Sequence, residues 1–186
     1  MAKSAYKYIK ENVRKNLKEK LPKWRRQKAA VKLDKPTDLD RARKLGYKSK
    51  KGVSVVRIRV KRGGRKRPKR KAGRKTKRKT NRKTLKMNYR WVSEIRAQKK
   101  FPNLVVLNSY QIAKDRDHYF YEVILVDPDK PEIKSDPDLN WICKKENRDR
   151  VEKGKTSAGK KSRGLRSKHP ANKSRPSVRA GRRQGK

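Results

Sequence analysis

Two long segments of this chain contain no acidic residue. Residues 41–93 and 153–186 lack Asp and Glu, whereas the residues between them, 94–152, hold 12 of the chain's 17 acids beside 11 Lys or Arg. The formal charge of this middle segment is therefore −1. Because unbalanced like charges oppose a compact state, we expect the middle segment to form a small folded core from which the acid-free segments extend.

The charge of the whole chain indicates a polyanionic partner. Lys and Arg number 62 among 186 residues, the net charge is +45, and apolar residues make up only 31%. So few apolar residues cannot form one large core. A phosphate backbone binds such a chain strongly, because Lys and Arg displace its condensed counterions. A membrane is a poorer partner, since the longest apolar run, residues 119–126, is interrupted by Glu122 and is far shorter than the ~20 residues that span a bilayer.

The chain offers little material for catalysis or metal binding. Cys143 is the only cysteine, which excludes an intramolecular disulfide and a Cys-rich zinc site. It is distant in sequence from His118 and His169, and we expect it to be a partly buried structural residue. Residues 154–160, GKTSAGK, match most of a phosphate-binding P-loop, but Lys161 replaces the Ser or Thr that would ligate magnesium. We therefore expect that the protein is not an enzyme and binds no cofactor or metal. The loop is still expected to contact phosphate without binding a nucleotide specifically.

Apolar periodicity predicts two helices near the N-terminus. Pro22 is expected to end the first of them, because proline lacks the N–H that a helix interior needs. The second is expected to begin near Thr37, which forms a weak capping box with Asp40, and to end before Gly46. The first helix is predicted over residues 4–21 from an apolar stripe of Ile9, Val13, Leu17 and Leu21.

Alternation with a period of two predicts one strand, and a short run of turn-forming residues predicts a hairpin of two more. In residues 53–60, VSVVRIRV, one face is expected to pack while the other presents charge through Arg57 and Arg59. Residues 104–113 and 118–126 flank a short polar turn and predict a hairpin.

A further helix is predicted over residues 84–100, with Pro102 preventing its continuation. A short helix is expected after the hairpin, capped by Asp136 with Pro137 at its first position. The order strand, helix, strand, strand predicts an α+β fold in which a small antiparallel sheet carries flanking helices and long basic extensions.

The basic runs are too dense to serve only as a solvated surface. Residues 61–86 hold 16 Lys or Arg and no acid, which favours contact with phosphate. A guanidinium binds phosphate bidentately or stacks on a base, and Tyr47 and Trp24 could stack on bases or fill the core. The candidate RNA-binding residues are Arg41, Arg43, Lys44, Tyr47, Lys48, Arg57, Arg59, Lys61, Arg62, Gly63, Gly64, Arg65, Lys66, Arg67, Lys69, Arg70, Lys155, Lys160, Lys161, Arg163, Arg166 and Lys168.

Four segments resemble the large-subunit ribosomal protein family numbered fifteen in archaea and eukaryotes. The resemblance follows the order of the chain, and the short, lysine-rich form is more similar to archaeal members. It implies binding to ribosomal RNA, no catalysis, and a small antiparallel sheet with long basic extensions. The segments are RARKLGYKSKKGVSVVRIRVKRGGRKRPK (41–69), VLNSYQIAKDRDHYFYEVILVDP (106–128), SDPDLNWI (135–142) and GKTSAGKKSRGLRSKH (154–169).

Residues and resemblance together predict a structural constituent of the large ribosomal subunit in the cytoplasm. Its expected partners are large-subunit ribosomal RNA and neighbouring ribosomal proteins, without a membrane or a small-molecule substrate. A DNA-packaging protein is the alternative, because it would share the charge and the tails. The expected division of the chain is N-terminal basic helices over 1–46, an α+β core over 47–60 and 84–152, a basic RNA-binding arm over 61–83 and a tail over 153–186 that is ordered only on RNA.

Overall fold

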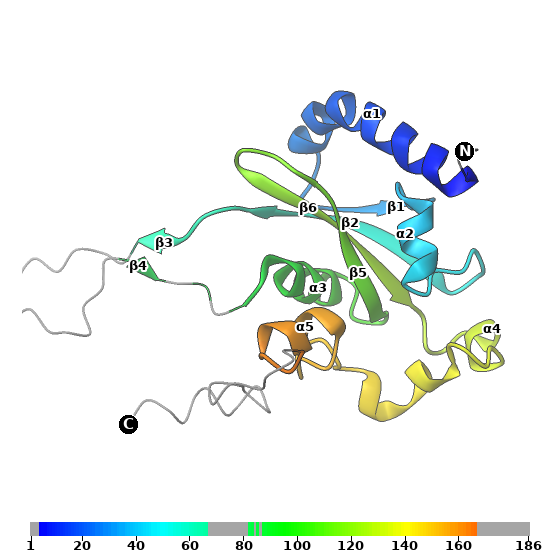
Figure 1. Ribbon diagram of the computed structural model, residues 1–186. Coiled ribbons are helices and arrows are strands. Elements are labelled where there is room, and N and C mark those ends of the chain that lie inside the picture. The colour runs from blue at the N-terminus through cyan, green and yellow to red at the C-terminus, as the bar shows by residue number, and fades with distance from the viewer. Residues whose placement is uncertain (1–3, 67–81, 84, 86, 167–186) are drawn as a thin grey trace, which may run out of the picture.

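A four-stranded antiparallel sheet forms the centre of the computed structural model, which describes residues 4–66, 82, 83, 85 and 87–166 (Figure 1). The strand order is β1-β2-β6-β5, so β5 and β1 are the edges. Helices lie on both faces of the sheet, and the predicted α+β class is confirmed. The strands are β1 (Ala30–Leu33), β2 (Val53–Lys61), β5 (Val105–Lys114) and β6 (His118–Val126).

The pairing of β2 with β6 holds the sheet together. It is antiparallel and unbroken from Val53 opposite Val126 to Lys61 opposite His118. The hairpin of β6 with β5 was predicted from sequence and is present, although β5 shifts register between Gln111 and Ala113 and again nearer its start. Such β-bulges bend an edge strand and change where its side chains point.

Helix α3 (Tyr89–Lys100) covers one face of the sheet. Its buried Trp91 and Ala97 pack with valines and isoleucine of β2 and with the odd-numbered residues of β6. The prediction that this helix begins at residue 84 is wrong. The side chain of Asn88 accepts a hydrogen bond from the backbone N–H of Trp91 at 2.7 Å, so it caps the helix and sets its start.

Helix α1 (Ala5–Arg26) and helix α2 (Leu39–Lys44) lie on the opposite face. The stripe predicted for α1 is half-buried as expected, but the helix passes through Pro22 instead of ending there. Trp24 explains the continuation: it is 6% exposed and its ring centroid lies 5.5 Å from that of Phe120 in β6. Packing of this large ring offsets the hydrogen bond that proline cannot donate.

The segment before the first long strand also differs from prediction. Asp38, rather than Thr37, caps α2 by accepting a hydrogen bond from the N–H of Arg41 at 3.1 Å. The N–H of Thr37 instead donates to the buried carboxylate of Glu122. Strand β1 was not predicted, since its four residues are too short to give a clear period.

The chain after β6 folds as short turns rather than the single capped helix expected. Helix α4 (Pro131–Lys134) was not predicted, and the next elements are the 3-10 helices η1 (Asn140–Cys143) and η2 (Lys145–Asn147). Asp136 caps no α-helix, because its carboxylate accepts from the N–H of Asp138 and from two lysines. Ile142 is buried and Trp141 half-buried, and both pack with Val105 and Val126 at the end of the sheet.

The predicted tail boundary at residue 153 differs from the structure. Helix α5 (Ser157–Ser162) packs on α3 through the buried Ala158. Thr156 caps α5 and donates its hydroxyl to Glu94 of α3 at 2.6 Å. Residues up to 166 therefore belong to the folded part, while 167–186 lie outside the described residues. Among the helices described, none is long and apolar enough to cross a membrane.

Candidate nucleic-acid interface

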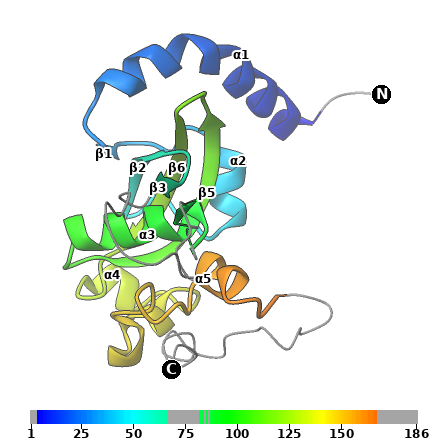
Figure 2. The same ribbon diagram turned by 90° about the vertical axis from the view of Figure 1, so that its left-hand side faces the viewer.

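An open cavity of about 960 Å³ is lined by α2, β5, β6, α3, α5 and the start of the arm. We call this cavity the groove, and we call residues 62–64, which join β2 to the rest of the arm, the foot of the arm. Viewed from the side on which the arm leaves the core, α2, β5 and α5 lie along the same side of the molecule (Figure 2). The groove joins candidate residues that are far apart in sequence: Arg41, Lys44, Gly63, Gly64 and Lys161.

Tyrosines form much of the groove wall. The rings of Tyr89 and Tyr119 lie 5.1 Å apart between centroids, and those of Tyr119 and Tyr121 lie 6.1 Å apart. The guanidinium of Arg62 stands 4.9 Å from the centroid of the Tyr119 ring. Cationic and aromatic groups therefore meet at the point where β2 leads into the arm.

The foot of the arm is fixed to the core. Arg62 donates its backbone N–H to Asp117 O at 2.7 Å and its side chain to Asp115 O at 2.8 Å. Gly63, with a φ of +97°, donates its N–H to the hydroxyl of Tyr89 at 3.0 Å. Two short segments of the arm pair as β3 (Arg65–Lys66) and β4 (Arg82–Lys83).

Several candidate residues are exposed on this side of the molecule or near it. Arg41 uses one guanidinium nitrogen to donate to Gln111 O at 2.7 Å, Lys44 pairs with Asp40 at 2.9 Å, and Arg166 donates to Ser157 Oγ at 2.8 Å. The exposed candidates are Arg41, Arg43, Lys44, Lys61, Arg62, Gly63, Gly64, Lys155, Lys160, Lys161 and Arg166. Nothing is described for Arg67, Lys69, Arg70 and Lys168, which lie outside the described residues, and for Arg65 and Lys66 only the backbone is described.

Other candidates use their charge inside the fold. Arg57 is 7% exposed, lies 4.3 Å from the ring centroid of Trp24 and donates to Gln27, so the expected charged face of β2 is wrong at this residue. Burial lowers the pKa of its guanidinium. Arg59 is half-buried and donates to Arg25 O, and the buried Arg163 donates to Gly154 O at 3.0 Å.

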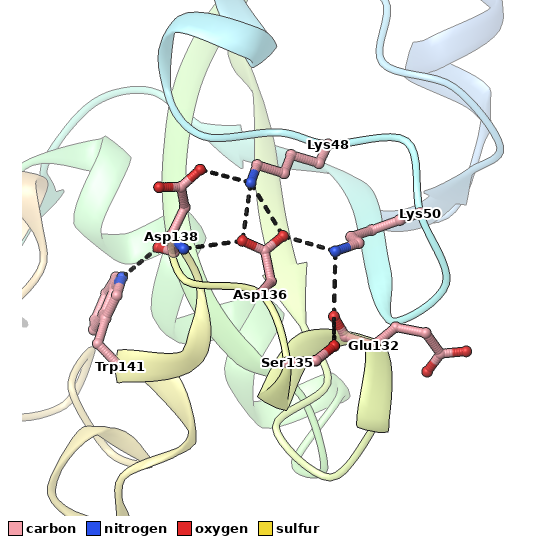
Figure 3. Close-up of polar contacts among 7 residues, drawn as sticks. All are labelled: Lys48, Lys50, Glu132, Ser135, Asp136, Asp138 and Trp141. Atoms are coloured by element: carbon pink, nitrogen blue, oxygen red, sulfur yellow. Dashed lines mark hydrogen bonds and ion pairs between the residues drawn. The ribbon is translucent and has the colours of Figure 1, made fainter.

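Lys48 is likewise engaged within the protein (Figure 3). Its ammonium lies 2.7 Å from Asp138 and 2.9 Å from Asp136, while Lys50 lies 2.7 Å from the second oxygen of Asp136. Hydrogen bonds from Lys50 and Lys48 hold the pKa of the Asp136 carboxyl well below its usual range. The hydrogen bond to Asp138 is the largest cause that raises the pKa of Lys48.

The aromatic candidates serve the core. Tyr47 is half-buried against Ala42, Tyr110 and Ile124, and Trp24 is buried against Phe120. The Trp24 ring is 6% exposed and has the guanidinium of Arg57 over it, so it offers little surface for base stacking.

A family model described as Ribosomal L15 matches residues 1–181. The chain belongs to the ribosomal L15 family. It is 47% identical, over 196 aligned residues that cover 100% of both chains, to a protein of the archaeon Methanocella arvoryzae named "Large ribosomal subunit protein eL15". The resemblance found in the sequence, including its archaeal character, is thus confirmed. Proteins of the ribosomal L15 family are generally structural rather than catalytic.

Sequence reasoning missed two features of this L15-family site. Tyr119 and Tyr121 were assigned only to a strand, although their spacing of two places both rings on the α3 face. Arg90 was passed over as one basic residue in a helix. It is half-buried beside the groove and donates to Ser109 Oγ at 2.9 Å and Asn108 Oδ1 at 2.7 Å.

The P-loop-like motif of this family member has a packing role in the described fold. The residues before Gly154 form turns rather than a strand, and the hydroxyl of Thr156 is engaged by Glu94. A Cβ on Gly159 would lie 2.7 Å from Gly154 Cα, so glycine permits this close backbone contact. The motif therefore lacks the strand that precedes a nucleotide-binding loop.

Proposed function

We infer that this protein is a structural constituent of the large ribosomal subunit, where it associates with ribosomal RNA and with other ribosomal proteins in the cytoplasm. Membership of the ribosomal L15 family along nearly the whole chain is the observation that carries this conclusion. The net charge of +45 supplies the physical reason, because a chain of this charge is compact beside a polyanion that neutralises it.

We propose that RNA phosphates contact the exposed cations of α2, the arm and α5. These residues support the proposal because they surround the foot of the arm. Among the exposed described cations that line the groove, only Lys44 forms an ion pair with an acidic residue, Asp40. Residues 61–83 would act as an RNA-binding arm. Lys48, Arg57 and Arg163 would shape the fold instead, since each is held by partners within the protein.

We further propose that the chain has no catalytic role and no small-molecule substrate. Its two fully buried carboxylates have structural partners that support this proposal. Glu94 accepts hydrogen bonds from Ser109 and Thr156, and Glu122 accepts from Tyr110 and Thr37. Each links separate elements of the fold.

Binding measurements over a range of salt concentrations test the proposed RNA contacts. The full chain is titrated into purified large-subunit ribosomal RNA, with duplex DNA of matched length as control. If ~6 to 10 phosphates are contacted, affinity for the RNA falls by ~10³ to 10⁵ between 50 and 200 mM salt. We expect folded RNA to be preferred at moderate salt. Equal affinity for DNA would favour a packaging protein instead, and a flat salt response would contradict the phosphate contacts.

A further inference from the structure

We propose that the groove holds one unstacked nucleotide of the RNA, with the base against the tyrosines and a phosphate at the cationic mouth. This inference rests on the proposed function, because the nucleotide is part of the bound RNA. It adds that the folded core recognises an unpaired base, whereas the proposed contacts of the arm are to RNA phosphates.

The groove wall includes a tyrosine whose hydroxyl is not enclosed by the protein and has no hydrogen-bond partner among the described residues. Tyr121 is 5% exposed, and burial raises its pKa to about 12. Its hydroxyl makes no hydrogen bond with any described residue, whereas the hydroxyls of Tyr89 and Tyr110 are bonded to Gly63 and Glu122. The hydroxyl of Tyr121 therefore remains available to a ligand in the groove. The edge of a nucleobase carries donors and acceptors that would supply a hydrogen-bond partner.

The mouth of the groove has the charge that a phosphate needs. Arg41 and Lys44 of α2 stand on one side and Lys161 of α5 on another, and no Asp or Glu lines the groove. Lys161 is exposed and makes no ion pair within the described part of the chain. Arg90 adds a half-buried guanidinium. The asymmetry between an aromatic wall and a cationic rim matches the base and the phosphate of one nucleotide.

Size and accessibility fit an unpaired nucleotide rather than a duplex. A volume of about 960 Å³ is at the upper end of the ~300 to 1,000 Å³ typical of small-ligand sites. The groove is open to solvent, so a nucleotide can enter it while it remains part of an RNA strand. In a duplex the base faces are covered by their neighbours, and only an unstacked base presents its face to an aromatic side chain.

Ultraviolet cross-linking of the full chain to purified large-subunit ribosomal RNA tests the occupant directly. After nuclease and protease digestion, mass spectrometry is expected to find a nucleotide attached to Tyr119 or Tyr121. A neighbouring protein seated in the groove would leave these tyrosines unmodified and would overturn the proposal.

Affinity measurements with matched variants provide the second test. We expect Tyr119→Ala to bind the RNA roughly 5- to 100-fold more weakly with an unchanged salt slope, because stacking on an aromatic ring carries no charge. Tyr6→Ala, which removes a tyrosine that is 47% exposed on α1, should bind as wild type does. Tyr121→Phe keeps the ring and its packing, and we expect it to weaken RNA binding several-fold because it removes the hydroxyl. This variant tests the groove even if Tyr119→Ala fails to fold.

Removal of the rim charge has a different signature. Lys161→Ala should lower the salt slope by ~0.7 to 0.9, whereas Lys134→Ala, an exposed lysine of α4 outside the groove, should not. Wild-type affinity in Tyr119→Ala and Tyr121→Phe, with no nucleotide on either tyrosine, would overturn the groove while leaving the proposed function intact. Failure of the wild-type chain to bind the RNA would instead contradict the proposed function.

Discussion

Basic residues of this chain divide into those that are exposed and those that are structural. Arg57, Arg90 and Arg150 are each at least half-buried, and burial lowers the pKa of all three guanidinium groups. Arg150, for example, donates one guanidinium nitrogen to Val106 O at 2.8 Å and Leu107 O at 2.7 Å, while its Nε is buried without a hydrogen-bond partner among the described residues. The sequence does not distinguish buried from exposed arginines, because both kinds have similar basic and apolar neighbours along the chain.

Asp136 gives a prediction at the scale of one residue. Its carboxylate joins Lys48 and Lys50 to the turn after α4, and these lysines hold its pKa below the ordinary value. Because the pKa of this carboxyl is lower in the folded state, the ionised carboxylate stabilises the fold at pH values above the unfolded pKa of ~3.9. This contribution to stability is lost as the pH falls from ~3.9 toward the folded pKa. We expect Asp136→Asn to lower the melting temperature at pH 6 and to narrow its difference from wild type toward pH 2. Thermal unfolding across this range measures the effect, with exposed Asp129→Asn as the control; a constant difference would contradict the ion-pair account.

Gly159 gives a second residue-scale prediction. Because its absent Cβ would lie 2.7 Å from the backbone of Gly154, Gly159→Ala requires the turn before α5 to move. We expect the free energy of unfolding to fall by ~1 to 3 kcal/mol, as for other overpacked sites. Denaturant titration measures this, and Lys160→Ala in the same helix, where the side chain is exposed, should have little effect. Equal stability of the two variants would mean that the turn adapts freely.

At the scale of elements, periodicity located the strands well and the helix ends poorly. Strand β2 was predictable from its alternation, and the β5–β6 hairpin from two apolar runs that flank a polar turn. The extension of α1 beyond Pro22 depends on Trp24 meeting Phe120, which is distant in sequence. The inclusion of α5 in the core depends in the same way on Thr156 meeting Glu94. Contacts of this kind are not visible in a local pattern.

The packing of β6 against α3 gives an element-scale prediction. Leu125 is fully buried in the cluster beneath α3, whereas Leu165, after α5, is 42% exposed. We expect Leu125→Ala to lower the free energy of unfolding by ~2 to 5 kcal/mol through lost transfer energy and an unfilled cavity. Leu165→Ala is the matched control and should cost far less. Comparable losses in denaturant titrations of the two variants would contradict the assignment of this face as the core.

At the scale of the whole molecule, the distribution of acids located only part of the folded centre, because β2 and α5 belong to it although they lie in acid-free segments. It did not anticipate the groove. The groove is assembled from α2, β5, β6, α3, α5 and the foot of the arm. Its cationic candidates were predictable one by one from their types. Their meeting around Tyr119 and Tyr121 was not, because it depends on the sheet order and on the bulged edge strand.

The separation of core and arm gives a prediction at this scale. Replacing Arg62, Arg65, Lys66 and Arg67 together with Ala should reduce the salt slope of RNA binding by about 3. The melting temperature should change little, since these residues follow the pairing of β2 with β6, and among them only Arg62 has a described side-chain bond to the core, to Asp115 O. A control that removes an equal number of charges from the near-neutral segment, at Lys130, Lys134, Lys144 and Lys145, should leave the slope nearly unchanged. Unfolding of the arm variant, or an unaltered slope, would rule out an RNA-binding role for this segment.

Because β3 pairs with β4, the arm is an insertion in the fold whose two ends lie side by side. Both of its ends leave the core at one place, Arg65 opposite Lys83, so the fold constrains where the arm starts and returns but not how long it is. Loop-closure entropy rises only slowly with length, by ~0.6 kcal/mol for each doubling. Changes in the length of the arm are therefore expected to cost the sheet that carries it little stability.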